Sequence, residues 1–154
     1  MRNELSRRLS QQFETRGDAP FLILGDGVMT YGEARSQIVT YVNAINQRAP
    51  DEKLIGVMAA RGADAYLATL AVILSGRGWV PLTPATPVAR LGQMVRQVDM
   101  ACILVDAESL PVFQQLCDEG PQITGIAVGA RPETPTGFGK FVQPEAPVAA
   151  ATIP

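Results

Sequence analysis

Few side chains in this sequence have the types and the spacing that catalysis requires. Histidine is absent, which excludes Ser-His-Asp and Cys-His arrangements and every metal site that needs imidazole. The two cysteines, Cys102 and Cys117, are too few for a thiolate metal cage. Cys102 lies in the apolar run ACILV, which is typical of a small core residue. We therefore expect two buried thiols in a cytoplasmic protein, and no cysteine nucleophile.

The acidic residues that stand next to each other form two pairs, Asp51–Glu52 and Asp118–Glu119, at the expected ends of helices. Adjacent side chains point in different directions, so neither pair is arranged to act on one substrate. We interpret both pairs as solvated helix ends. Arg7 and Arg8 share a segment with acidic residues and indicate a solvated helix face.

A phosphate-binding loop would be the most informative motif, and the segment TPTGFGK over residues 134–140 contains glycines and a lysine. A Walker loop needs glycine at position 134 and serine or threonine at position 141, where this sequence has Thr134 and Phe141. No expected strand immediately precedes the segment, which therefore indicates a flexible turn. The dinucleotide fingerprint GxGxxG follows none of the expected strands. We assign no catalytic, cofactor-binding or metal-binding residue.

The elements that would position a site alternate along the chain. The hydrophobic spacing and the turn residues predict strands over residues 21–24, 28–29, 54–58, 79–82, 101–105 and 123–128, and helices over residues 3–16, 30–47 and 63–74, after Thr86 and after Ser109. The first two strands should form a hairpin. The later alternation predicts an α/β fold with a largely parallel sheet layered with helices.

Several helix ends have specific signals. Thr30 and Glu33 have the spacing of a capping box. Thr86 before Pro87 predicts an N-cap followed by a first-turn proline, with Leu91, Met94, Val95 and Val98 on one face of the helix. Residues 63–74 are apolar nearly all round, which predicts a buried helix.

The composition excludes several classes of protein. A length of 154 residues with 47% hydrophobic and 18% charged residues is typical of about one globular domain. A net charge of −2 provides no basic surplus for a nucleic acid. The longest apolar run, residues 63–74, is shorter than the ~20 residues of a membrane span. We expect a domain over residues 1–129 and a Pro/Gly-rich linker over residues 130–154.

The connection over residues 76–87 contains two glycines, a tryptophan and three prolines, which predict a stiff and specific path between two helices. At this point the sequence resembles the adenylate-forming (AMP-binding) enzymes, above all the amino-acid-activating adenylation domains of nonribosomal peptide synthetases. Residues 29–34, MTYGEA, are similar to the first core motif, L-T/S-Y-x-E-L. Residues 73–82, ILSGRGWVPL, are similar to the second, L-K-A-G-x-A-Y-V-P-L-D, and PATPVAR over residues 84–90 is similar to its usual continuation.

The chain departs from this pattern at three places within the second motif. Thr83 replaces the usual aspartate, Gly78-Trp79 replaces Ala-Tyr, and residues 73–75 read Ile-Leu-Ser in place of Leu-Lys-Ala. The resemblance covers roughly residues 3–128. It implies the first subdomain of an adenylation core that is incomplete here, because the phosphate loop, the nucleotide and substrate contacts and the catalytic lysine of the family come later in its sequences.

The resemblance implies an ATP-dependent ligase that makes an aminoacyl-adenylate and transfers the acyl group to a carrier-protein thiol. Mg-ATP is implied for the complete enzyme, with no cofactor bound by this chain and no activity of this chain alone. The expected partners are the remainder of the adenylation domain or another chain, and a carrier protein; no nucleic acid and no membrane are expected. Two alternatives remain: a fragment of an acyl-CoA or aryl-acid ligase, and a short non-catalytic module that docks on a larger synthetase.

Overall fold

The computed structural model describes residues 4–25, 27–120, 122–129 and the backbone of residues 141–142. The described elements, in chain order, are α1 (Glu4–Thr15), β1 (Pro20–Leu24), β2 (Gly27–Thr30), α2 (Tyr31–Arg48), β3 (Leu54–Met58), α3 (Ala63–Leu74), β4 (Gly78–Pro81), α4 (Val88–Gln97), β5 (Cys102–Asp106), α5 (Leu110–Asp118), β6 (Thr124–Val128) and β7 (Phe141–Val142). The predicted α/β class and the alternation of helices and strands are confirmed.

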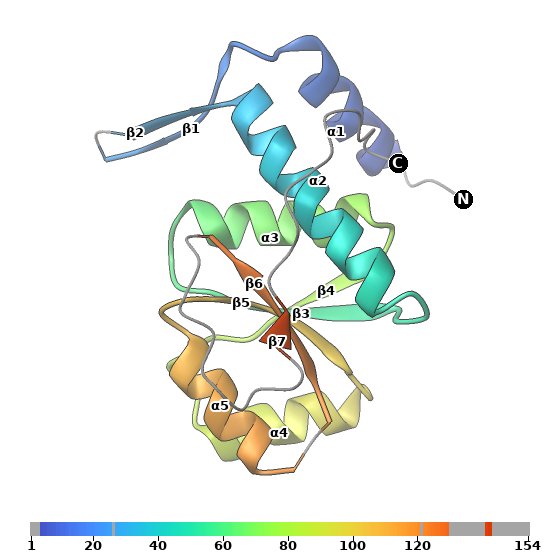
Figure 1. The fold of residues 1–154 in the computed structure, drawn as a ribbon, viewed down its shortest axis with the longest axis vertical. Coiled ribbons are helices and arrows are strands. Elements are labelled where there is room, and N and C mark those ends of the chain that lie inside the picture. The colour runs from blue at the N-terminus through green and yellow to red at the C-terminus, as the bar shows by residue number, and fades with distance from the viewer. Residues whose placement is uncertain (1–3, 26, 121, 130–140, 143–154) are drawn as a thin grey trace.

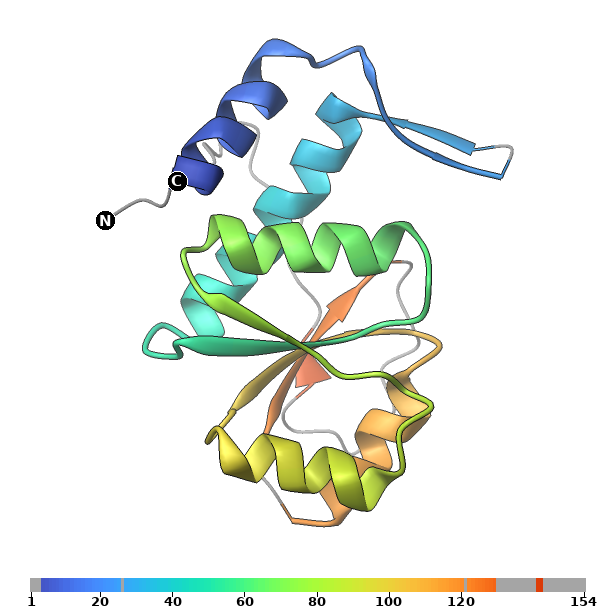
Figure 2. The same cartoon turned by 180° about the vertical axis from the view of Figure 1, so that it is seen from behind.

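The main sheet has five strands in the order β4-β3-β5-β6-β7, and every neighbouring pair is parallel. Helices α2 and α3 cover one face of this sheet, with α1 packed against them, while α4 and α5 cover the other face (Figures 1 and 2). The predicted layered parallel sheet is therefore confirmed. β7 lies within the segment expected to be a linker, and the boundary at residue 129 stays a prediction.

The central strands are buried on both faces, as their continuous apolar sequences indicate. In β5, Cys102 and Leu104 join the core beneath α2 and α3, while Ile103 and Val105 join the core beneath α4 and α5. Burial raises the pKa of the Cys102 thiol to about 12, which agrees with its expected role as a core residue. Cys117 is half-buried, so the expectation of two fully buried thiols is wrong for it.

Helix α2 begins as its sequence predicts. The Glu33 backbone N–H donates to Thr30 Oγ1 at 3.2 Å, and the Thr30 backbone N–H donates to a Glu33 carboxylate oxygen at 2.8 Å. This reciprocal pair satisfies two N–H groups that have no partner inside the helix. The same two hydrogen bonds hold the end of β2 to the first turn of α2.

Helix α4 begins later than its sequence signals indicate. Pro87, with an extended backbone, occupies the N-cap position itself, and neither Thr86 nor Pro87 supplies a side-chain cap to the helix. Proline disfavours helical backbone at the residue before it, so Thr86 stays outside the helix. Leu91 and Val95 are buried as predicted, but Val98 is the C-cap and is 40% exposed.

Helix α3 has the predicted bounds but is covered on one side only. Leu67, Ala68, Ala71 and Val72 are fully buried, while Tyr66 is 55% exposed. The prediction of a helix buried all round is therefore wrong in this chain. Apolar residues show that a surface is suited to burial, but they do not supply the element that covers it. Within the described residues, no helix is both long and apolar enough to span a membrane.

The hairpin β1–β2 forms a separate antiparallel sheet of two strands. Its base is attached to the core by an aromatic cluster of Phe13, Phe21 and Tyr31, whose ring centroids lie 5.0–5.5 Å apart. Gly25 at the turn has a φ of 58°, a backbone conformation that favours glycine. The hairpin extends away from the rest of the molecule in both views of the fold (Figures 1 and 2).

Candidate functional site

The order in which strands are added to the sheet changes direction between the neighbouring strands β3 and β5. After β3 the chain continues into α3 on one face, and after β5 it continues into α5 on the other, so a crevice opens between the carboxyl ends of these two strands. In open parallel sheets, ligands bind in crevices of this kind. The crevice has a volume of about 290 Å³ and is lined by Ala60, Arg61, Gly62, Ala63, Asp64, Asp106, Ala107 and Glu108.

Asp106, the last residue of β5, lies at the bottom of this crevice and is only 6% exposed. One carboxylate oxygen accepts the Ala60 backbone N–H at 2.6 Å, and the other accepts the Ser109 backbone N–H at 2.8 Å. The side chain therefore connects the loop after β3 to the start of α5. Hydrogen bonds to a charged group are among the stronger ones in proteins, so Asp106 fixes the shape of the crevice.

Asp64 in the first turn of α3 is the second carboxylate of the crevice. Burial raises the pKa of Asp64, and the nearby charge of Asp106 raises it further. Gly129, directly after β6, has a φ of 80°, and a Cβ on it would overlap the Asp64 carboxylate. The Gly129 backbone N–H donates to the Tyr41 hydroxyl at 2.8 Å, which holds the end of β6 against α2.

These groups support the loops at the carboxyl edge. Both oxygens of Asp106 already accept hydrogen bonds from backbone N–H groups. No group of three or more His, Cys, Asp or Glu side chains within the described residues is placed to hold a metal ion. The expectation that residues 134–140 form a flexible turn falls outside the described residues.

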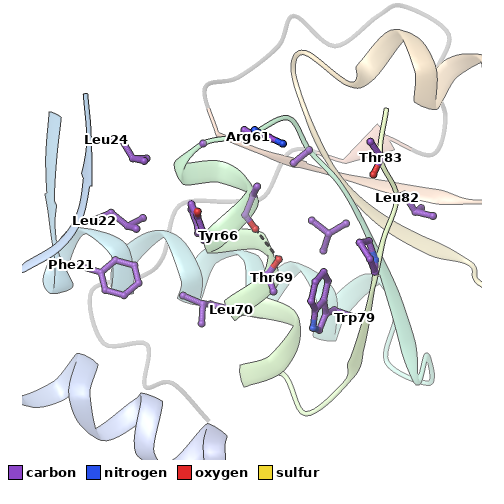
Figure 3. Close-up of a pocket in the computed structure, with 15 residues that line it drawn as sticks. Phe21, Leu22, Leu24, Arg61, Tyr66, Thr69, Leu70, Trp79, Leu82 and Thr83 are labelled. Atoms are coloured by element: carbon purple, nitrogen blue, oxygen red, sulfur yellow. Dashed lines mark hydrogen bonds between the residues drawn. The ribbon is translucent and has the colours of Figure 1, made fainter. Parts of the chain in front are cut away.

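A second hollow, an apolar groove of about 1080 Å³, lies over α3 between the hairpin and β4. Figure 3 shows Phe21, Leu22 and Leu24 on the hairpin side and Trp79 on the β4 side. Tyr66, Thr69 and Leu70 of α3 lie between these two walls, and the Thr69 hydroxyl donates to the Ala65 carbonyl within the helix at 2.9 Å. Arg61 and Thr83 supply polar groups at the lining of the groove.

The shaped connection after α3 is fixed by Arg77, a residue that the sequence analysis did not single out. Its guanidinium donates to the carbonyls of Ala49, Pro50 and Glu52 after α2, at 3.1–3.2 Å. It also donates to Asn46 Oδ1 at 2.8 Å and to the Ser75 carbonyl at 3.0 Å. Arg77 thereby joins the end of α2 to the start of β4. The last carbonyls of a helix have no partner within the helix, so a nearby arginine is a suitable donor for them, and this is the sequence signal that could have identified Arg77.

The other residues singled out from the sequence lie apart from both hollows. Arg7 and Arg8 form exposed ion pairs with Glu4 on α1, at 2.8 Å each, so the interpretation of a solvated face is confirmed. Asp118 is the last residue of α5 and Glu119 is its C-cap, as the expected solvated end requires. Gly76 has a φ of 79°, which only glycine adopts readily.

The comparisons with known proteins agree on one family. A family model described as AMP-binding enzyme matches residues 9–149. The chain is similar to the PKS-NRPS hybrid synthetase acdB of Aspergillus candidus, with 28% identity over 83% of this chain. It is also similar to enterobactin synthase component F of Escherichia coli (strain K12), with 28% identity over 86% of this chain.

The chain matches only a small part of each relative. It spans 5% of the synthetase acdB and 10% of enterobactin synthase component F. The solved structure of IdnL7 superposes with a TM-score of 0.77 and 22% identity, over 96% of this chain and 29% of the IdnL7 chain. At that identity the likeness shows a shared fold.

Proposed function

Because this chain belongs to the AMP-binding enzyme family, we propose that it is the N-terminal part of an amino-acid-activating adenylation domain of the nonribosomal peptide synthetase type. The observation that carries the proposal is the family match over residues 9–149, which includes both motif segments, residues 29–34 and 73–82. The similarity to synthetases such as acdB supports the amino-acid-activating type over the other ligases of the family.

In the complete enzyme, a substrate carboxylate oxygen attacks the α-phosphorus of Mg-ATP, which forms an acyl-adenylate and releases pyrophosphate. A carrier-protein thiol then attacks the acyl carbon and releases AMP. The described residues of this chain offer no phosphate cradle and no cluster of metal ligands, so we assign Mg-ATP and both chemical steps to the rest of the enzyme. The remainder of the adenylation domain and a carrier protein are the partners, in the cytoplasm.

The part of this chain in the reaction is to hold the sheet and its loops. Asp106 fixes the loop after β3 against the start of α5, and Arg77 fixes the path from α3 into β4. In this proposal residues 1–129 form the N-terminal subdomain, and residues 130–154, which include β7, lead towards the phosphate-loop segment. The chain contributes a preorganised wall, which is how remote residues help a reaction without touching the substrate.

The test is amino-acid-dependent exchange of pyrophosphate into ATP. The 154-residue chain alone should stay at background, because its described residues offer no groups that bind and activate ATP. The same chain, joined to the part of IdnL7 that it does not match, should exchange pyrophosphate with an amino acid. Robust exchange by the 154-residue chain alone would overturn the assignment.

A further inference from the structure

Two helices hold the chain at the point where it leaves β6. Gly129 directly follows Val128, which pairs with Asp106 in the register of β5 and β6, so Gly129 lies at the carboxyl edge of the sheet. From α2, the Tyr41 hydroxyl accepts the Gly129 backbone N–H at 2.8 Å. From α3, the Asp64 carboxylate occupies the space that a Cβ on Gly129 would need. A small movement of Gly129 therefore breaks the first contact or compresses the second.

The Tyr41 side chain is well suited to fix this point. Tyr41 lies in the middle of α2 and is only 5% exposed. A buried tyrosine hydroxyl usually has a hydrogen-bond partner, and here the partner is a backbone group 88 residues away. Burial raises the pKa of Tyr41, and the nearby charge of Asp64 raises it further, so the hydroxyl stays neutral at pH 7. A rigid aromatic side chain thus connects α2 to the end of β6.

The position of Gly129 matters because of the edge on which it lies and of the segment that follows it. In open parallel sheets, ligands bind outside the carboxyl ends of the strands, and β6 is the direct neighbour of β5 at this edge. In the proposed function, the chain after Gly129 continues towards the phosphate-loop segment. A displacement of about 1 Å far from the reacting atoms can slow a reaction roughly 100-fold. A contact that fixes Gly129 can therefore affect the reaction without touching the substrate.

We propose that Tyr41 is a positioning residue for adenylation, which acts through the Gly129 N–H to fix where the chain leaves β6 on its way to the nucleotide-binding segment. Tyr41 touches neither ATP nor the substrate, and it limits the positions that this segment can take. Asp64 limits the same point sterically, and Asp106 holds the adjoining loop after β3 through the Ala60 N–H. The proposal rests on the proposed function and names a residue through which this chain contributes to it.

The variant Tyr41→Phe tests this role, because it removes the hydroxyl and keeps the ring. It is made in the joined polypeptide, in which the part of IdnL7 that this chain does not match follows the 154 residues. In amino-acid-dependent pyrophosphate exchange, measured well below the melting temperature, kcat/KM for ATP should fall roughly tenfold. Ser6→Ala is the matched control, since it also removes one buried hydroxyl that bonds a distant backbone group, the Ile73 carbonyl at 3.2 Å, between α1 and α3. It should leave kcat/KM for ATP unchanged.

An unchanged kcat/KM for ATP in Tyr41→Phe would overturn the proposal. So would an equal loss in Ser6→Ala, because lost stability would then explain both. If the unmodified joined polypeptide shows no pyrophosphate exchange with any amino acid, the proposed function fails, and amide hydrogen exchange of the same polypeptide then decides the role of Tyr41. Tyr41→Phe should speed amide exchange in β7, the strand after Gly129, roughly tenfold relative to Ser6→Ala. Equal rates in β7 would overturn the positioning role, so the two failures are distinguishable.

Discussion

Asp64 carries a carboxyl group whose ionisation the folded state disfavours. Its pKa is raised above 3.8 by burial and by the charge of Asp106, so the folded state binds this proton more tightly than the unfolded state does. Protonated Asp64 therefore stabilises the folded state. This stabilisation is complete below the pKa of Asp64 in the unfolded chain and is lost as the pH rises through its pKa in the folded chain. We therefore predict that Asp64→Asn raises the melting temperature at pH 7 relative to the unmodified chain.

Thermal unfolding between pH 3 and pH 7 measures this effect. The difference in melting temperature between Asp64→Asn and the unmodified chain should grow as the pH rises. Asp118→Asn, at the solvated end of α5, is the control and should leave the melting temperature at pH 7 unchanged. A variant that is less stable than the unmodified chain at pH 7 would show that the Asp64 carboxylate makes a favourable contact there.

Arg77 contributes to stability through the carbonyls that it satisfies. Removing its guanidinium leaves the carbonyls of Ala49, Pro50 and Glu52 without this donor, and Arg77→Ala should cost about 2 kcal/mol. A loss of that size lowers the melting temperature by roughly 4–8 °C in a chain of this length. Urea unfolding measures the free energy, with the exposed Arg90→Ala as the control. Equal stability of the two variants would contradict this role.

At the scale of the element, the turn from α3 into β4 depends on a glycine for its backbone conformation. Gly76 has a φ of 79°, and a Cβ there would meet no atom within 4 Å, so the cost of a side chain is conformational. Gly76→Ala should therefore destabilise the chain by about 1 kcal/mol. Gly17→Ala is the control, because Gly17 has equal space and no such positive φ. Equal unfolding midpoints would mean that the turn relaxes without cost.

Gly78, two residues later, depends on space instead of conformation. A Cβ at this position would lie 2.7 Å from Leu54 Cδ2 of the neighbouring strand. Gly78→Val should lower the melting temperature clearly, because the added side chain overlaps Leu54 and either this side chain or β4 must shift. The additional variant Leu54→Ala should recover part of the loss when both changes are combined. If the melting temperature does not recover, its loss must come from the backbone conformation that valine prefers at position 78, and not from the overlap with Leu54.

At the scale of the whole molecule, the exposed apolar side chains of the hairpin and the groove should be detectable by a dye that binds exposed apolar surface. Ile23, Val28, Tyr66 and Trp79 are all more than two-fifths exposed and lie at the hairpin tip or the groove. Soluble monomers rarely expose large contiguous apolar patches, so dye fluorescence should rise with the 154-residue chain and fall in the Ile23→Glu and Val28→Glu double variant. A compact monomer without dye binding would favour a self-sufficient docking module.

The sequence alone determined the order and the type of the elements, because these depend on neighbouring residues. The bounds of β3 and α3 follow from local apolar runs, and the capping box of Thr30 and Glu33 lies within four consecutive residues. The family resemblance likewise rests on two short motifs, and the family match confirms it. Two local signals still failed, at Thr86 and Val98, where proline geometry and the helix end were decisive.

Only the tertiary structure decided which distant groups meet. Asp106 accepts from the Ala60 N–H, 46 residues away, and Arg77 reaches a carbonyl 28 residues away at Ala49, and no local spacing encodes either contact. The exposed side of α3 and the uncovered hairpin tip are tertiary results for the same reason. An apolar sequence indicates that burial of a surface is favourable. Which element buries it depends on the path of the whole chain.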